Sequence, residues 1–94
     1  MESLLDSMTV TLSRPFEING VTVETITVRE PKLRDRILFS KDKGDAEEKT
    51  ARMLARLANL NIEDIYSLPS CDYMKMEEAF NELVKIPTDR KQIL

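Results

Sequence analysis

The chain lacks histidine and tryptophan altogether, and it has only two glycines, one cysteine and few aromatic residues. Without histidine it lacks the commonest general acid/base, the base of Ser-His and Cys-His nucleophilic sites, and the usual zinc partner of cysteine. Two glycines are too few for a Walker loop or a dinucleotide-binding fingerprint. These absences argue against catalysis, a bound metal and a nucleotide cofactor.

The remaining candidates for chemistry are acids and a lone cysteine. Cys71 cannot form a disulfide within the chain and is typical of a reducing compartment. The acids between residues 42 and 48 do not follow the spacing of a calcium loop, and lysines interleave with them. A chain of 94 residues also offers little room for a deep cleft. We therefore expect no catalytic residue, metal site, cofactor or small-molecule substrate.

The charge is mildly negative, at −3. Nucleic-acid binding relies on Lys and Arg that neutralise phosphates, and the one basic stretch, Arg29–Lys43, is interrupted by three acids. No apolar run is long enough to cross a bilayer, and Met1–Ser7 does not resemble a signal peptide. The composition predicts a cytoplasmic protein that binds neither nucleic acid nor a membrane.

The clearest local signal is a β-hairpin with its turn at Asn19-Gly20, a pair that supplies the two positive-φ positions of a type I′ turn. Alternating apolar residues on both sides predict one long, bent hairpin from about Met8 to Arg29. Ile26 and Val28 fall one residue out of step with Val21 and Val23, which predicts a β-bulge near Glu24-Thr25. Pro15 places its strand at a sheet edge or an irregularity.

Helical patterns follow the hairpin. We expect helices over about 31–39, from 46 to about 58, over 62–68, and from a cap at Ser70 to Pro87. Asp45 and Asn61 are expected to cap the second and third, and Asn59 to take the left-handed conformation that ends the second. One face of the last helix carries Tyr73, Met76, Phe80, Leu83 and Val84.

Strands followed by helices define an α+β fold: an N-terminal β-hairpin with three to four short α-helices packed on it. The expected organisation is an N-terminal extension over 1–7, one α+β domain over 8–86, and a flexible C-terminal tail over 87–94.

A two-stranded hairpin leaves both outer edges unpaired, and such edges invite strand addition by another copy or by a client. The predicted partner-binding residues are Val10, Leu12, Val28, Leu33, Phe39, Tyr73 and Met74. Ordinary packing is the alternative for each of them. Periodicity favours a core position for Tyr73, whereas Met74 lies off the apolar stripe and is the better surface candidate.

Two passages resemble the small tail assembly chaperones of contractile-tailed bacteriophages, including the Mu-like ones. The first runs from Ile18-Asn19-Gly20 to Arg29-Glu30-Pro31, and the second runs from Leu54 through Asn59 and Ile65 to Asp72-Tyr73. Family members have a strand, an Asn-Gly turn, a strand ending in Arg-Glu-Pro, and a helix ending in Gly-Leu before a Ser-Pro-Glu-Asp cap. The chain departs from this pattern at Asn59, where the family often has Gly, and at Asn61-Ile62, where it often has Ser-Pro.

The resemblance implies a non-catalytic phage or prophage protein that binds the tape measure protein during tail assembly and stays out of the mature virion. It would act in the cytoplasm of the bacterial host, and self-association through a hairpin edge is also expected. Two alternatives remain open from the residues. One is a small acidic regulatory adaptor or inhibitor of another cytosolic protein. The other is a nucleic-acid-binding domain that uses Arg29, Lys32, Arg34 and Arg36.

Overall fold

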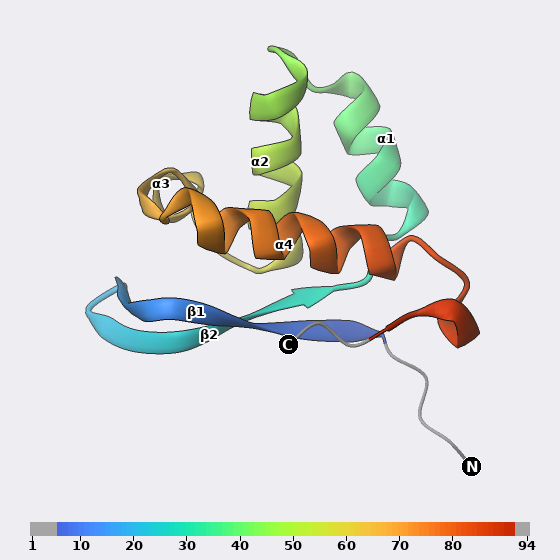
Figure 1. Cartoon of the computed structure of the whole chain (residues 1–94). Coiled ribbons are helices and arrows are strands. Elements are labelled where there is room, and N and C mark those ends of the chain that lie inside the picture. Colours follow the sequence, from blue (N-terminus) through green and yellow to red (C-terminus); the bar gives the residue numbers. More distant parts are fainter. Residues whose placement is uncertain (1–5, 92–94) are drawn as a thin grey trace.

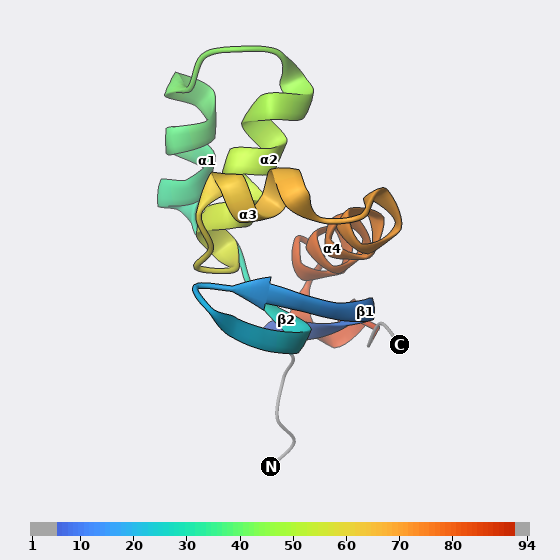
Figure 2. The ribbon, with the colours of Figure 1, turned by 90° about the vertical axis from the view of Figure 1, so that its left-hand side faces the viewer.

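The computed structural model describes residues 6–91. In chain order these form β1 (Ser7–Ile18), β2 (Val21–Arg29), α1 (Leu33–Lys41), α2 (Ala46–Leu57), α3 (Ile62–Ser67), α4 (Ser70–Leu83) and the 3-10 turn η1 (Pro87–Asp89). The strands make a two-stranded antiparallel sheet. Helix α4 lies along one face of the hairpin, and α1 and α2 project side by side away from that face (Figure 1). The quarter-turned view shows the same arrangement (Figure 2). The α+β prediction is confirmed.

The turn between the strands has the predicted geometry. Asn19 has a φ of 52° and Gly20 a φ of 78°, so both central residues take the positive values of a type I′ turn. A methyl group at Gly20 would meet no atom of residues 6–91 within 4 Å, so the backbone conformation is what requires glycine there.

The sheet irregularity lies at the predicted level of the hairpin but on the opposite strand. The register runs Thr11↔Thr25 and then Phe16↔Val23, so the four residues Leu12–Pro15 of β1 face only Glu24 of β2. The predicted bulge in β2 is therefore wrong, and the extra residues belong to β1. Pro15 has no N–H to give to the ladder, and the Ser13 N–H is donated to Asp72 of α4 at 2.8 Å. The predicted irregularity at Pro15 is confirmed.

The caps of α2 and α3 agree with the predictions. The Asp45 carboxylate accepts the Glu48 N–H at 2.8 Å at the start of α2. Asn59 has a φ of 57°, in the left-handed region that ends the helix. At α3, Asn61 is the N-cap and its own N–H is donated to Asp64 at 3.3 Å. These ends are set by residues that are neighbours in sequence.

Two helix starts differ from the predictions. Helix α1 begins at Leu33, two residues after Pro31, because the Asp35 carboxylate accepts the Lys32 N–H at 2.8 Å and defines the first turn there. In α4, Pro69 is the N-cap and Ser70 is already the first helical residue, which corrects the predicted Ser70 cap.

The core lies between the inward face of the hairpin and the helices. Its buried apolar residues are Met8, Val10, Leu12, Ile26, Val28, Ala51, Met53, Leu54, Ala55, Leu57, Ile65, Leu68, Met76, Ala79 and Leu83. Tyr73 and Phe80 pack against this core, but Val84 is exposed, which corrects its place on the buried face of the last helix. Val84 lies just past the end of α4, where the chain leaves the helical path.

The chain beyond α4 retains contacts with the domain. Residues Pro87–Asp89 form η1, and the Lys91 N–H is donated to Glu82 at 2.8 Å. Arg90 forms an ion pair with Glu30 at 2.7 Å. The predicted tail thus begins as a segment packed on the domain, and residues 92–94, like 1–5 of the predicted N-terminal extension, lie outside the described residues.

Candidate functional site

A buried carboxylate joins the end of the hairpin to α1 and α2. Asp35 is fully buried and receives two hydrogen bonds from the Arg29 guanidinium, at 2.9 and 3.0 Å. It also receives the Lys32 N–H and the Nε of Arg56, the latter at 3.3 Å. The Arg29 hydrogen bonds hold the pKa of Asp35 well below its usual range, against the opposing effect of burial. This cluster links the strand exit to both helices.

Glu30 makes a second ionic cluster beside the first. Its two carboxylate oxygens pair with Lys32 at 2.8 Å and with Arg90 at 2.7 Å. The Lys32 and Arg90 hydrogen bonds lower the pKa of Glu30. Residues that follow α4 are thereby attached to the residues that precede α1.

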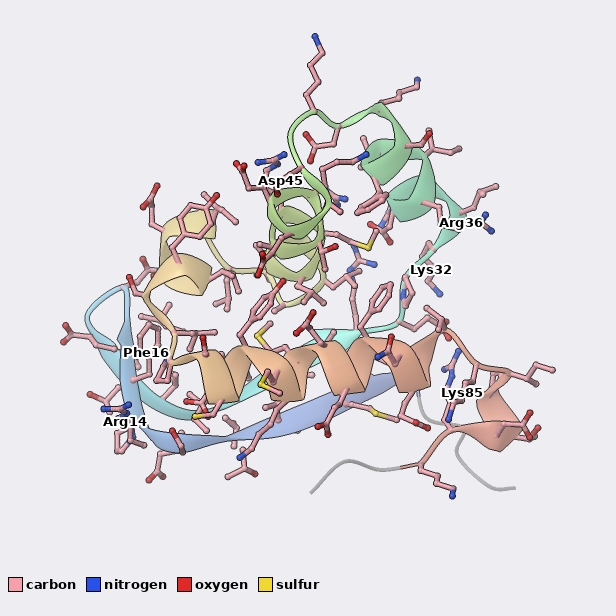
Figure 3. All side chains as sticks on the ribbon, turned by 45° about the horizontal axis from the view of Figure 1, so that its top comes forward. Arg14, Phe16, Lys32, Arg36, Asp45 and Lys85 are labelled. Atoms are coloured by element: carbon pink, nitrogen blue, oxygen red, sulfur yellow. The ribbon has the colours of Figure 1, made fainter. Side chains whose placement is uncertain are left out.

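A groove runs between the start of α1 and the end of α4, and we call it the α1/α4 groove. It has a volume of about 540 Å³ and is lined by Pro31, Lys32, Leu33, Arg36, Met53, Phe80, Leu83, Val84 and Arg90. Figure 3 shows Lys32 and Arg36 on one side of this end of the molecule and Lys85 on the other. Arg14 and Phe16 lie at the opposite end. The groove therefore combines an apolar floor with a basic rim.

Large apolar side chains stand exposed on the α1/α4 groove, at Leu33 and Val84, and close to these two residues in sequence. Leu33 is 68% exposed, Val84 57% and Ile86 68%. Ile37, one turn further along α1 than Leu33, is 45% exposed. Scattered exposed apolar residues are ordinary, but a cluster around a concave surface is characteristic of a binding site. This is the strongest candidate surface among the described residues.

A second pocket lies between α2, α3 and α4, with a volume of about 320 Å³. Three acids from the start of α2, Asp45, Glu47 and Glu48, line it together with Tyr66 and Tyr73. The Tyr73 hydroxyl is buried with no hydrogen-bond partner in the part of the chain that the structure describes, and burial raises the pKa of Tyr73 to about 12. The α1/α4 groove is thus lined by basic residues, and this second pocket, which we call the acidic pocket, is lined by acids.

The three strand residues predicted to bind a partner lie in the core. Val10, Leu12 and Val28 are 0%, 7% and 0% exposed. Their side chains point toward the helices because the hairpin buries that face. Strand addition uses backbone groups instead, so a role for these positions at an edge remains a prediction.

The other four predicted residues are distributed over the helices. Leu33 lines the α1/α4 groove, and Tyr73 lines the acidic pocket. Phe39 is half-buried, with the Lys49 ammonium 4.6 Å from its ring centre. Met74 is 58% exposed on α4 and lines neither pocket. The structure therefore does not bring these residues together into one site.

Sequence reasoning missed Val84, Ile86 and the groove position of Arg36. The sequence pattern places Arg36 only in a basic stretch and Val84 only on the apolar face of the last helix. The available signal lies in the sequence itself, where Lys85 separates the apolar residues Val84 and Ile86 just before Pro87. This pattern is unusual for a buried helix end.

Two further observations concern residues 6–91. No group of three or more metal-binding side chains occurs among them. None of their helices is long and apolar enough to cross a membrane.

The fold and its surfaces are those of a small domain whose main features are an open two-stranded sheet and two concave surfaces between helices. The model of the family described as "Phage tail assembly chaperone proteins, E, or 41 or 14" matches residues 9–85, and the chain belongs to this family. Comparisons with curated proteins and with solved structures found no significant match. The family resemblance noted in the sequence is confirmed, and family membership suggests a non-enzymatic role with a protein partner in tail assembly.

Proposed function

We propose that this protein is a non-catalytic chaperone that binds the tape measure protein during phage tail assembly. The observation that carries the proposal is the family match over residues 9–85, which covers the hairpin except for its first two residues and covers helices α1 to α4. Binding would cover apolar surface of the tape measure protein until tail tube subunits assemble around it. Exposed apolar side chains on the helices supply surface for such contacts.

Family membership favours this function over the other two hypotheses. A small regulatory adaptor would need no resemblance to tail assembly proteins. A nucleic-acid-binding domain would need free cations, yet Arg29 and Lys32 are engaged with Asp35 and Glu30. Arg34 and Arg36 alone give few phosphate contacts.

Co-expression with the tape measure protein of the same phage or prophage tests the proposal. A tagged chaperone is expected to retain the tape measure protein on an affinity column and to keep it soluble. A tape measure protein that is soluble alone and passes through the column would contradict the proposal.

We further propose that the protein acts in the cytoplasm of the bacterial host and is absent from the finished tail. Mass spectrometry of purified particles and of infected or induced cell lysate checks this. The peptides of this chain are expected in the lysate alone.

A further inference from the structure

We propose that the α1/α4 groove binds an amphipathic helix of the partner whose apolar face is flanked by acidic residues. The inference rests on the proposed function, since it identifies the kind of tape measure segment that would bind and the surface that receives it. It is carried by the charge and shape of the groove.

Charge is the first argument. The whole chain has a net charge of −3, yet the described lining of the groove contains three cations, Lys32, Arg36 and Arg90, and no carboxylate. Glu30, beside the groove, pairs with both Lys32 and Arg90, so Arg36 is the lining cation most available to a partner. The Arg36 side chain has no hydrogen-bond or ion-pair partner within residues 6–91. An acidic partner would therefore meet a basic lining, with Arg36 as its accessible cation, on an otherwise acidic protein.

The apolar content of the groove is the second argument. Its floor contains Met53, Phe80 and Leu83, which belong to or pack on the core, and its edges carry the exposed Leu33 and Val84. Apolar side chains from a partner would cover Leu33 and Val84 while contacting the floor. A purely anionic ligand would leave these side chains in water.

The geometry of the groove favours a helix over an added strand. The floor is formed by side chains of α2 and α4 and the edge by α1, so no open strand edge is available along it. Pro31, which also lines the groove, has no N–H to donate. A helix that places apolar residues at i, i+3, i+4 and i+7 docks through side chains alone, as in other helix-in-groove complexes.

A pair of synthetic helical peptides tests the inference with the full-length protein. Both have leucines at positions i, i+3, i+4 and i+7; one has glutamates along the flanks and the other has lysines at the same positions. The glutamate peptide is expected to bind about tenfold more tightly, and the difference should shrink as salt is added. Equal affinities, or no binding by either peptide, would overturn the inference.

Two matched pairs of variants locate the binding. Arg36→Glu is expected to weaken binding of the glutamate peptide about tenfold, while Arg34→Glu, an exposed change on the same helix outside the groove lining, should stay within about twofold of the parent. Val84→Glu is likewise expected to weaken binding of the glutamate peptide about tenfold. Met74→Glu, at an equally exposed position on α4, should change this affinity little. Equal effects within either pair would place the binding elsewhere.

Backbone amide shifts in two-dimensional NMR spectra separate the remaining outcomes. Shifts confined to the hairpin on peptide addition would indicate strand addition and overturn the inference.

Self-association is a separate outcome. If Arg36→Glu abolished self-association of the chain, the groove would bind a second copy of the chain, and this result would also overturn the inference.

The same variants in the tape measure pull-down distinguish this inference from the proposed function. If the parent protein retains the tape measure protein and Arg36→Glu and Val84→Glu retain it equally well, the groove assignment is wrong and the function stands. If the parent does not retain it while the glutamate peptide still occupies the groove, the function is wrong and the groove assignment stands.

Discussion

At the scale of single residues, Asp35 is the side chain on which the arrangement of the strand exit depends most. It is a fully buried carboxylate that receives hydrogen bonds from two arginines and one backbone N–H. Asp35→Asn keeps the shape but removes the charge, so both guanidinium groups lose their counter-ion. We expect the free energy of unfolding to fall by about 2–3 kcal/mol, since breaking a buried pair is costly and Arg29 remains partly solvated.

Chemical denaturation of the variant and the parent, followed by circular dichroism, measures this loss. Asp42→Asn is the matched control, because Asp42 also pairs with an arginine, Arg52 at 2.7 Å, but lies nearer the surface. A control variant that loses as much stability as Asp35→Asn would contradict the importance assigned to burial.

The same carboxylate predicts how stability depends on pH. Its pKa in the folded protein lies below that of an unfolded aspartate, which is roughly 3.9. The unfolded chain therefore takes up this proton first as pH falls. The contribution of Asp35 is fully present above about pH 5 and is lost as pH falls from there toward the folded pKa. Stability measured between pH 7 and 3 should decline less steeply in Asp35→Asn than in the parent, and parallel curves would refute this.

At the scale of secondary-structure elements, a contact between β1 and α4 decides the irregular part of the hairpin. The Asp72 carboxylate accepts the Ser13 N–H at 2.8 Å and the Ser13 hydroxyl at 3.0 Å. Asp72 is 1% exposed. The segment Leu12–Pro15 does not pair with β2, and the bond to Asp72 gives the Ser13 N–H an acceptor in place of a ladder partner.

Asp72→Ala is expected to lower the free energy of unfolding by about 1–3 kcal/mol, because the Ser13 N–H loses its acceptor in a partly buried position. Ser13→Ala removes only the hydroxyl bond and should cost less. Hydrogen exchange at residues 11–16 checks the local effect: Asp72→Ala should speed exchange there more than in α2. Equal losses of stability in the two variants would show that the backbone bond contributes little.

The helix boundaries show how much of each element could be predicted. The caps at Asp45 and Asn59 were predicted because each depends on a side chain or a conformation within one turn of sequence. The start of α1 and the site of the bulge were missed. The Asp35 bond to the Lys32 N–H lies within one turn, but Asp35 is also bonded to the more distant Arg29 and Arg56. The bulge depends on the contact of Ser13 with Asp72, which is distant in sequence.

At the scale of the whole molecule, the edges of the sheet are not equivalent. The Glu30 N–H is donated to the Asp6 carbonyl, so these two residues form a hydrogen-bonded pair across the hairpin. Such pairs alternate along an antiparallel ladder with pairs whose backbone groups point outward, and Thr11 and Thr25 form an outward-pointing pair. On β1 the outward Thr11 carbonyl accepts the Lys75 ammonium at 2.9 Å, and Ser13 bonds Asp72. Side chains of α4 thus occupy part of the β1 edge, and the β2 edge is the more open one.

We predict self-association through the β2 edge. Sedimentation at high concentration should show a dimer in equilibrium with monomer, and Thr27→Pro should shift it toward monomer because it removes an outward N–H. Circular dichroism of the variant must match the parent, and Thr9→Pro on β1 serves as the control. A parent protein that sediments only as monomer would refute the prediction.

The sequence by itself determined the order of the elements, the Asn19-Gly20 turn, most of the caps and the absence of histidine-based chemistry. Each of these depends on residue type and on neighbours within a few positions, which a sequence displays directly. Only the tertiary structure decided that Val10, Leu12 and Val28 face the core, and that Leu33, Arg36 and Val84 share one groove. Leu33 and Arg36 lie on α1 and Val84 lies about 50 residues later, so their proximity follows from the packing of α1 on α2 and of α2 and α4 on each other and on the hairpin.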